Sequence, residues 1–193
     1  FVDLNDDGIT ELVYATTNGE IYALKPDGAE LQGWPVTTDP IPLMEDSAGY
    51  NSSEISLPVF SPIMIGSPAI GDLEGDGNLE VVAADMEGKV YVWEPDGSRR
   101  DGFPVSTNRA YSTVFRPNGE YRRDKDNRVD WGISAQPALS DLNGDGSLEI
   151  VAGGMDMHVY AWQADGTALP GWPVYLRSPE KVDFVEPGTH FTV

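Results

Sequence analysis

Three short acidic segments of this 193-residue chain have the residue types and the spacing of a metal-binding loop. They begin at Asp3, Asp72 and Asp141, 69 residues apart, and each places oxygen-bearing side chains at positions 1, 3, 5 and 9. Carboxylate and amide oxygens are the hard ligands that Ca²⁺ prefers. Glycine always stands at position 6, where a backbone that wraps a cation has to turn sharply. The pattern predicts three calcium sites.

A turn between strands is the simplest alternative for one such segment, because Asp, Asn and Gly favour turns for local reasons. Three copies argue against it, since turn chemistry does not require acids at positions 1, 5 and 9 every time. The EF-hand and its dockerin-like relative close the site with an acid at position 12, at the start of a helix. Here position 12 is Tyr14, Ala83 or Ala152, and the residues after each loop have the β-branched content of a strand.

Each loop lies inside a longer repeat that predicts four short antiparallel strands. One strand leads into the loop, as at 68–72, and a second follows it. A turn such as Asn18-Gly19, a strong hairpin signal, leads to a third strand. An Asp-Gly turn then precedes a segment of glycine, an aromatic residue, proline and valine. Four such strands per unit are typical of a β-propeller blade, and the fold class is therefore predicted to be all-β.

Aromatic residues recur on the third strand of the units, and they allow two interpretations. They could form a stacking platform for sugars or bases, or they could pack between blades. Strict recurrence on a middle strand favours packing, because aromatic side chains bury large areas there. The residues concerned are Tyr22, Tyr91, Trp93, Tyr160 and Trp162.

The succession of aspartate loop, hairpin, aromatic strand and Gly-Trp-Pro-Val segment resembles the FG-GAP/VCBS repeats of integrin-α-like β-propellers. The resemblance covers blades at about 1–36, 66–105 and 135–174. It implies that the loop joins the first two strands of a blade and holds Ca²⁺. It also implies a ring of about seven blades, of which this chain would supply three. The sequence begins without methionine inside a predicted strand, so we expect flanking blades in a longer polypeptide.

The resemblance also assigns the ligands of the three sites. Each site would use four side chains and the carbonyl of position 7, where the side chain varies freely. Site two departs from the pattern because Glu74 replaces the usual Asp or Asn, and its extra methylene would crowd the cation or push the contact through water. The ligands would be Asp3, Asn5, Asp7, Ile9 and Glu11; Asp72, Glu74, Asp76, Asn78 and Glu80; and Asp141, Asn143, Asp145, Ser147 and Glu149.

Composition excludes several classes of function. Twelve Lys and Arg oppose 32 Asp and Glu, and a net charge of −20 excludes nucleic-acid binding through phosphate neutralisation. The absence of cysteine leaves packing and metal to stabilise the fold. No apolar run is long enough to span a membrane, so direct membrane insertion is not expected.

Two insertions, 37–65 and 106–134, and a tail at 175–193 separate or follow the predicted blades, and their length suggests functional loops. Eight of the twelve cations lie between Arg99 and Arg128. A solvated, self-paired loop is one interpretation of this cluster. The other is a patch for an acidic glycan or protein, formed by Arg116, Arg122, Arg123 and Arg128. Asn51-Ser-Ser53 matches a glycosylation sequon.

Catalysis finds little support in this sequence. The two histidines, His158 and His190, accompany no nucleophile or metal motif. The leading hypothesis is a non-catalytic, calcium-binding propeller module of a secreted or cell-surface protein, which binds a protein or glycan ligand through its inter-blade loops. A propeller domain of a polysaccharide lyase acting on acidic glycans is the main alternative. A metal-free, quinoprotein-like propeller would leave the aspartates unexplained.

Overall fold

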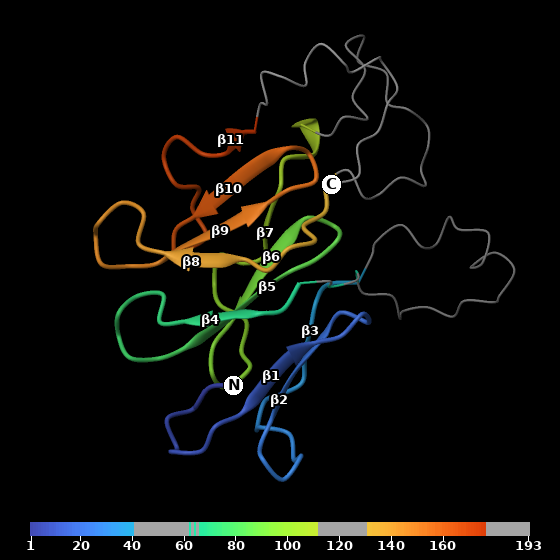
Figure 1. Cartoon of the computed structure of the whole chain (residues 1–193), viewed down its shortest axis with the longest axis vertical. Helices are drawn as coiled ribbons and strands as arrows, with labels where there is room; N and C mark the ends of the chain where they lie inside the picture. Colours follow the sequence, from blue (N-terminus) through green and yellow to red (C-terminus); the bar gives the residue numbers. More distant parts are fainter. Residues whose placement is uncertain (41–61, 63, 65, 112–130, 177–193) are drawn as a thin grey trace, which may run out of the picture.

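The computed structural model describes residues 1–40, 62, 64, 66–111 and 131–176. Within these residues the chain is all-β apart from a single 3₁₀ turn, η2 (Arg109–Tyr111), as the sequence predicts. Its strands form three antiparallel sheets, which succeed one another along the long axis of the molecule (Figure 1). Each sheet is built from one repeat, so the three sheets are successive blades of a β-propeller segment.

The strand order inside each sheet follows the order in the chain, as in a simple meander. The first sheet contains β1 (Leu12–Ala15), β2 (Glu20–Leu24) and β3 (Val36–Thr37). The second contains β4 (Ala69–Gly71), β5 (Glu80–Ala84), β6 (Lys89–Trp93) and β7 (Val105–Ser106), and the third β8 (Ala138–Ser140), β9 (Glu149–Gly153), β10 (His158–Trp162) and β11 (Val174–Tyr175).

The first sheet replaces its opening strand with a single bridge between Val2 and Glu11. The backbone N–H of Val2 donates to the Glu11 carbonyl at 3.0 Å, and the reverse bond measures 2.6 Å. The acidic loop therefore joins the first two strands of every blade, as predicted. The hairpin between β9 and β10 has no glycine at its tip, and Met157 adopts a φ of 64° in its place.

The middle sheet is buried on both faces, which explains why its two central strands are apolar almost throughout. Val81, Ala83, Tyr91 and Trp93 pack against the first sheet. The alternate residues Val82, Ala84, Val90 and Val92 pack against the third sheet. Side chains of a strand alternate between its two faces, so each sheet can bury one set of residues toward each neighbour.

Four of the five recurring aromatic residues lie between the blades, which confirms the packing interpretation for these four. Tyr91 stacks on Trp93 with ring centroids 5.4 Å apart, and Tyr160 stacks on Trp162 at the same distance. All four are buried. Tyr22 is half-buried and stacks on Tyr14, on the face of the first sheet that no described sheet covers.

The Gly-aromatic-Pro segment of one blade packs against the Asp-Gly turn of the next blade. A Cβ atom on Gly33 would lie 1.9 Å from the Asp96 carbonyl oxygen, and one on Gly102 would lie 2.2 Å from that of Asp165. Both glycines also have positive φ, so no other residue fits either position. The peptide bond before the proline of this segment is cis in all three blades: Trp34–Pro35, Phe103–Pro104 and Trp172–Pro173.

Asp85 is a buried carboxylate at the turn between β5 and β6, at the end of the blade away from the acidic loops. Its Oδ1 accepts the N–H groups of Glu87 at 2.9 Å and Lys89 at 3.0 Å. Burial raises the pKa of Asp85 to about 6, although these N–H groups oppose the shift.

The raised pKa of Asp85 predicts a specific pH dependence of stability. The folded protein retains this proton between pH 4 and 6 while the unfolded chain releases it, so the contribution present at low pH is lost as pH rises through about 6. From pH 4 to pH 7 the stability of Asp85→Asn relative to the parent should therefore rise by about 2 kcal/mol, because only the parent loses this contribution. Urea unfolding of both proteins across this range measures the difference, and parallel pH profiles would contradict the assignment.

In the described residues no helix is both long and apolar enough to cross a bilayer. Most of the predicted insertions at 37–65 and 106–134, and most of the tail at 175–193, lie outside these residues. Asn51 of the sequon and His190 lie there too.

Candidate metal sites

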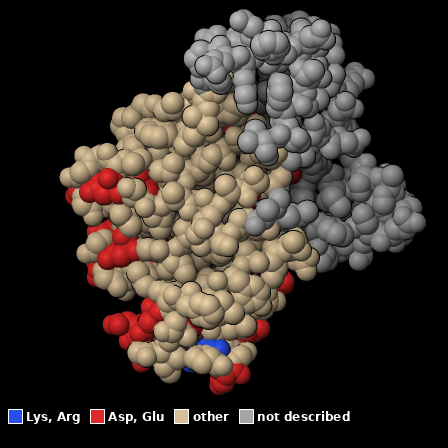
Figure 2. Space-filling model, viewed as in Figure 1, with Lys and Arg blue, Asp and Glu red and all other residues tan. Residues whose placement is uncertain are grey.

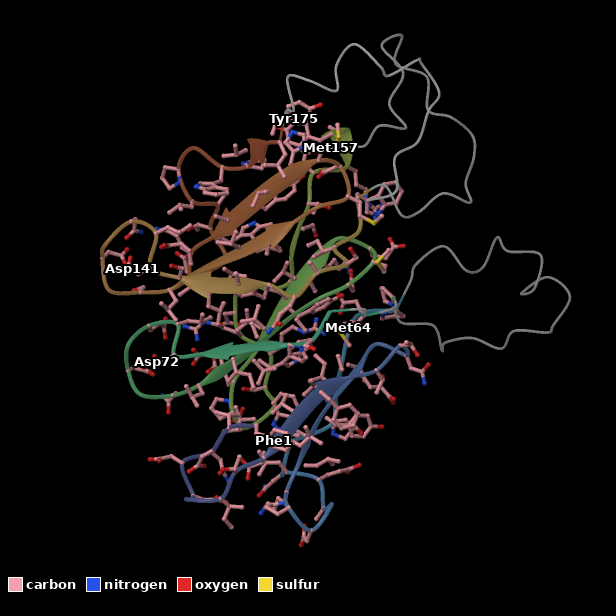
Figure 3. The ribbon with its side chains drawn as sticks, viewed as in Figure 1. Phe1, Met64, Asp72, Asp141, Met157 and Tyr175 are labelled. Carbon is pink, nitrogen blue, oxygen red and sulfur yellow. The ribbon has the colours of Figure 1, made fainter. Side chains whose placement is uncertain are left out.

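The three acidic loops lie on the same side of the molecule, one at the corresponding end of each blade (Figure 3). In the view of Figure 2 their carboxylates form red clusters along that edge. Loops that are 69 residues apart in the sequence therefore lie in a row along one side of the molecule.

The first aspartate of every loop organises the backbone of the loop around its own carboxylate. In the second loop, Asp72 Oδ1 accepts the N–H groups of Gly75 at 2.7 Å and Asp76 at 3.0 Å, and Oδ2 accepts that of Gly77 at 2.8 Å. The carboxylates at position 1 of the first and third loops accept the N–H of position 6 at 2.8 and 3.1 Å. The Gly77 N–H is the main reason that the pKa of Asp72 lies below its usual range.

The aspartate at position 5 holds the second half of the loop. Its Oδ1 accepts the N–H of position 7 at 2.9, 2.9 and 2.8 Å in the three loops. This bond lowers the pKa of Asp145 in the third loop, so that carboxylate is ionised at neutral pH. Each carboxylate has about four lone-pair sites, and the N–H bonds leave some of them for a cation. The pairs are Asp7 with Ile9, Asp76 with Asn78, and Asp145 with Ser147.

The glutamate at position 9 is buried in every loop, because it also begins the second strand of the blade or bridges to the first. Its Oε2 accepts the N–H of the leucine at position 2, at 2.9, 2.8 and 2.7 Å in the three loops. The other oxygen differs from loop to loop. Glu11 is fully buried, and its Oε1 has no hydrogen-bond partner among the described residues.

In the third loop an amide group holds two predicted ligands together. Asn143 Nδ2 donates to Asp145 Oδ2 and to Glu149 Oε1, both at 2.9 Å. The carboxylates of positions 5 and 9 therefore converge on one point near the side chain of position 3. In the first loop the amide of Asn5 makes the corresponding bond to Asp7 at 3.1 Å.

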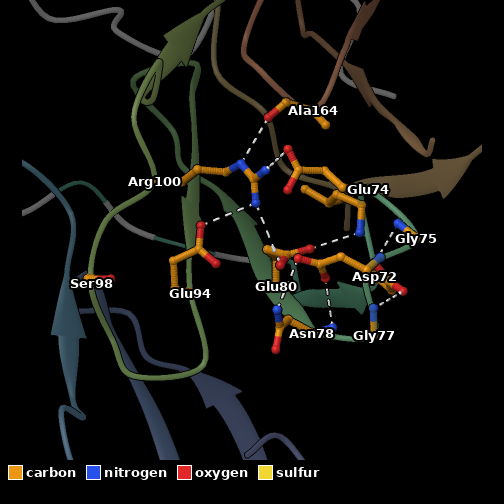
Figure 4. Close-up of polar contacts among 12 residues, drawn as sticks. Asp72, Glu74, Gly75, Gly77, Asn78, Glu80, Glu94, Ser98, Arg100 and Ala164 are labelled. Carbon is orange, nitrogen blue, oxygen red and sulfur yellow. Dashed lines mark hydrogen bonds and ion pairs between the residues drawn. The ribbon is translucent and has the colours of Figure 1, made fainter.

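In the second loop an arginine instead binds the side chains of positions 3 and 9 (Figure 4). Arg100 forms ion pairs with Glu74, with Glu80 at 3.6 Å and with Glu94 at 3.2 Å. Its Nε donates to the carbonyl of Ala164 in the third blade at 3.1 Å. Burial lowers the pKa of Arg100, but Glu74 and the other two glutamates outweigh it and raise the pKa overall. Burial raises the pKa of Glu80, and the positive charge of Arg100 partly opposes this shift.

The residues of the first and third loops suit calcium by their donor set. Each combines two aspartates, one asparagine and one buried glutamate, and the unpartnered Oε1 of Glu11 needs a positive partner to offset the cost of burial. Within the described part of the chain, no group of three or more His, Cys, Asp or Glu side chains is arranged to hold a metal ion. Asn5 and Asn143, whose side-chain amides donate the hydrogen bonds described above, are the fourth members of these sets.

Open grooves border the first and third loops. One of about 770 Å³ lies between the first and second loops and is lined by Asn5, Leu31 and Asn78 among others, and one of about 480 Å³ is lined by Asn143 and Leu169. Position 100 of the second blade corresponds in the repeat to the leucine of each groove.

The described arginines of the cationic segment are all paired with acidic side chains outside that segment. Arg99 binds Asp39 at 2.8 Å, and Arg109 binds Glu87 at 3.1 Å. These partners and those of Arg100 lie outside the segment, so the three described arginines pair with other parts of the chain and not within a solvated, self-paired loop. The sequence alone placed Arg100 in this segment and missed its role at the second loop; the signal was its alignment with Leu31 and Leu169 in the other repeats. The predicted patch, Arg116, Arg122, Arg123 and Arg128, lies outside the described residues.

No protein-family model matches the sequence, and no curated protein matches it. Among solved structures, the chain is similar to BBS1N in two crystal structures of its complex with ARL6DN. The crystal soaked with lead matches at 19% identity and a TM-score of 0.45, over 91% of this chain and 38% of that chain. The crystal soaked with mercury matches at 19% identity and 0.45, over 87% and 36%. This chain thus spans less than two-fifths of the length of either neighbour.

Proposed function

We propose that this chain is a calcium-binding β-propeller module of the kind formed by FG-GAP/VCBS repeats. It acts as a rigid, non-catalytic scaffold, and its inter-blade loops bind a protein or a glycan. The observation that carries the calcium proposal is the buried Glu11, whose Oε1 lacks a partner inside an acidic loop. A buried carboxylate oxygen without a partner is costly, and a bound cation would offset that cost.

The charge of the loops supports the same proposal. Three acids among the predicted ligands crowd each of the first and third loops, and Asp6 adds a fourth acid to the first. Neither loop has a Lys or Arg ion partner within the described residues. Their mutual repulsion is relieved by a divalent cation. In millimolar calcium outside the cell, sites with dissociation constants near 10 μM would be filled, so an extracellular or cell-surface location fits the proposal.

The outer face of the third blade, which no described sheet covers, supports the proposal that further blades complete the ring. Gly33 and Gly102 each contact the turn of the following blade, whereas a Cβ atom on Gly171 would meet no described atom within 4 Å. A further repeat on this face would make the same contact with Gly171.

A matched pair of substitutions tests the calcium proposal. Asp145 and Asp165 are both exposed, and each accepts the N–H of the residue two positions later at 2.8 Å. Only Asp145 belongs to an acidic loop. Asp145→Asn should weaken calcium binding at the third loop by about tenfold or more, because a charged ligand is lost. Isothermal titration calorimetry on metal-free protein measures the change.

Asp165→Asn is the control, since it alters the same kind of turn outside the loop. It should leave calcium affinity unchanged and cost less than about 0.5 kcal/mol of stability. Equal losses of calcium affinity in the two variants, or no calcium binding by the parent protein at low salt, would overturn the proposal.

A further inference from the structure

The three buried glutamates at position 9 share the partner of one oxygen and differ in the partner of the other. In the first loop no described group is a partner of Glu11 Oε1, and in the third loop Glu149 Oε1 accepts an amide N–H from Asn143. In the second loop Glu80 Oε1 lies 3.6 Å from a guanidinium nitrogen of Arg100. One loop of the three therefore already contains a cation.

The sequence shows that this arginine belongs to a coordinated set of differences between the repeats. At the place of Arg100, the other repeats have the apolar Leu31 and Leu169. At the place of Glu74 they have asparagine, which is neutral. The second repeat thus combines an added acid and an added base, and the structure brings the two together as an ion pair.

Arg100 also supplies a hydrogen bond to the next blade, which a tryptophan supplies in the first blade. Trp34 Nε1 of the first blade donates to the carbonyl of Pro95 in the second blade at 3.0 Å. The residue that corresponds to Trp34 in the second blade is Phe103, which has no donor. Arg100 Nε instead donates to Ala164, the counterpart of Pro95 in the third blade. Its side chain is only 11% exposed, so the guanidinium is fixed between the blades.

We propose that Arg100 is the built-in counter-ion of the second loop and takes the place of its calcium ion. The chain then binds two calcium ions tightly, at the first and third loops. The second loop keeps its shape without metal, through the ion pairs of Arg100 with Glu74 and Glu80. This inference rests on the proposed calcium binding of the other two loops.

Two physical reasons make the second loop a poor calcium site. Arg100 engages the side chains at positions 3 and 9, which are two of the four predicted side-chain ligands. A divalent ion in the loop would also lie close to the fixed positive charge of the guanidinium, and this repulsion weakens binding by about a hundredfold relative to the other loops.

The test is the number of calcium ions bound by metal-free protein in a calorimetric titration. The parent chain should bind two ions tightly. The double variant Glu74→Asn/Arg100→Leu copies the residues of the first and third loops and removes both charges together, so it should bind three. Glu74→Asn alone retains the guanidinium and should still bind two. Arg99→Leu, which removes the neighbouring arginine and its ion pair with Asp39, is the control and should also bind two.

A second measurement follows the loop without calcium. In EDTA, Arg100→Leu should melt at a lower temperature than the double variant, because it leaves Glu74 and Glu94 beside the buried Glu80 without a cation. Adding calcium should recover part of that loss.

The outcomes separate this inference from the calcium proposal itself. Three tight ions in the parent chain would overturn the role of Arg100 and leave the calcium proposal intact. Two ions in the double variant would overturn it as well. Equal melting temperatures of Arg100→Leu and the double variant in EDTA would also overturn it. No calcium binding by the parent chain would instead overturn the proposed function.

Discussion

Free calcium at a hundred times its dissociation constant is expected to raise the free energy of unfolding of the metal-free protein by about 5 kcal/mol. Each occupied loop contributes about 2.7 kcal/mol at this ratio, and the first and third loops are the two expected to be filled. Urea unfolding followed by tryptophan fluorescence, in EDTA and in calcium, measures the gain. The midpoint should move while the slope with urea stays the same, because the exposed surface is unchanged.

Two salts separate specific binding from general screening of a chain with a net charge of −20. Sodium chloride at matched ionic strength screens the repulsion but fills no site. Magnesium prefers a smaller octahedral shell and keeps its waters, so it should reproduce only a small part of the gain. Equal stabilisation by sodium, magnesium and calcium would show that the loops are not calcium sites.

The second large effect is expected from Trp93→Ala, which should cost about 3 to 5 kcal/mol of stability. Trp93 is 2% exposed and packs between the first and second sheets, so its removal leaves a cavity that the neighbouring blades cannot fill. Chemical unfolding of the variant in saturating calcium measures this loss with the metal contribution held constant.

Tyr14→Ala is the matched control for this experiment. Tyr14 stacks on Tyr22 with centroids 5.3 Å apart, nearly the same stacking distance as Tyr91 and Trp93, but it is 36% exposed. Its loss should cost only about 1 kcal/mol, the order expected for an aromatic pair without full burial. A similar loss from both variants would mean that stacking, and not burial between blades, determines the cost.

Together these results would describe a scaffold with two kinds of support between and within its blades. Aromatic and apolar side chains hold neighbouring sheets together, and charge neutralisation holds the acidic loops. In the first and third loops the proposed neutralising ion is calcium, and in the second loop it is Arg100. A blade with its own guanidinium would keep its loop in place when calcium is withdrawn, so the middle blade would be the least sensitive to chelation.

The sequence by itself determined the features that depend on neighbouring residues. The 69-residue period, the alternating strands, the hairpin turns and the acidic loop between the first two strands follow from local patterns, and the structure has them all. The loop hydrogen bonds of Asp72 and Asp145 are local too, since their partners lie two to five residues away. Such contacts are specified by residue type and spacing alone.

Only the tertiary structure decided which charges meet. Arg100 lies 26 positions after Glu74 and 64 before Ala164, and its place in the sequence suggested a cationic segment. Packing of the third blade against the second brings the Ala164 carbonyl to it, and the fold of the second blade brings the acids. The buried state of Glu11 and the tight fit of Gly33 against Asp96 arise in the same way. The reason is physical: burial and long-range pairing depend on how blades stack, and no local pattern encodes the partner that a neighbouring blade will present.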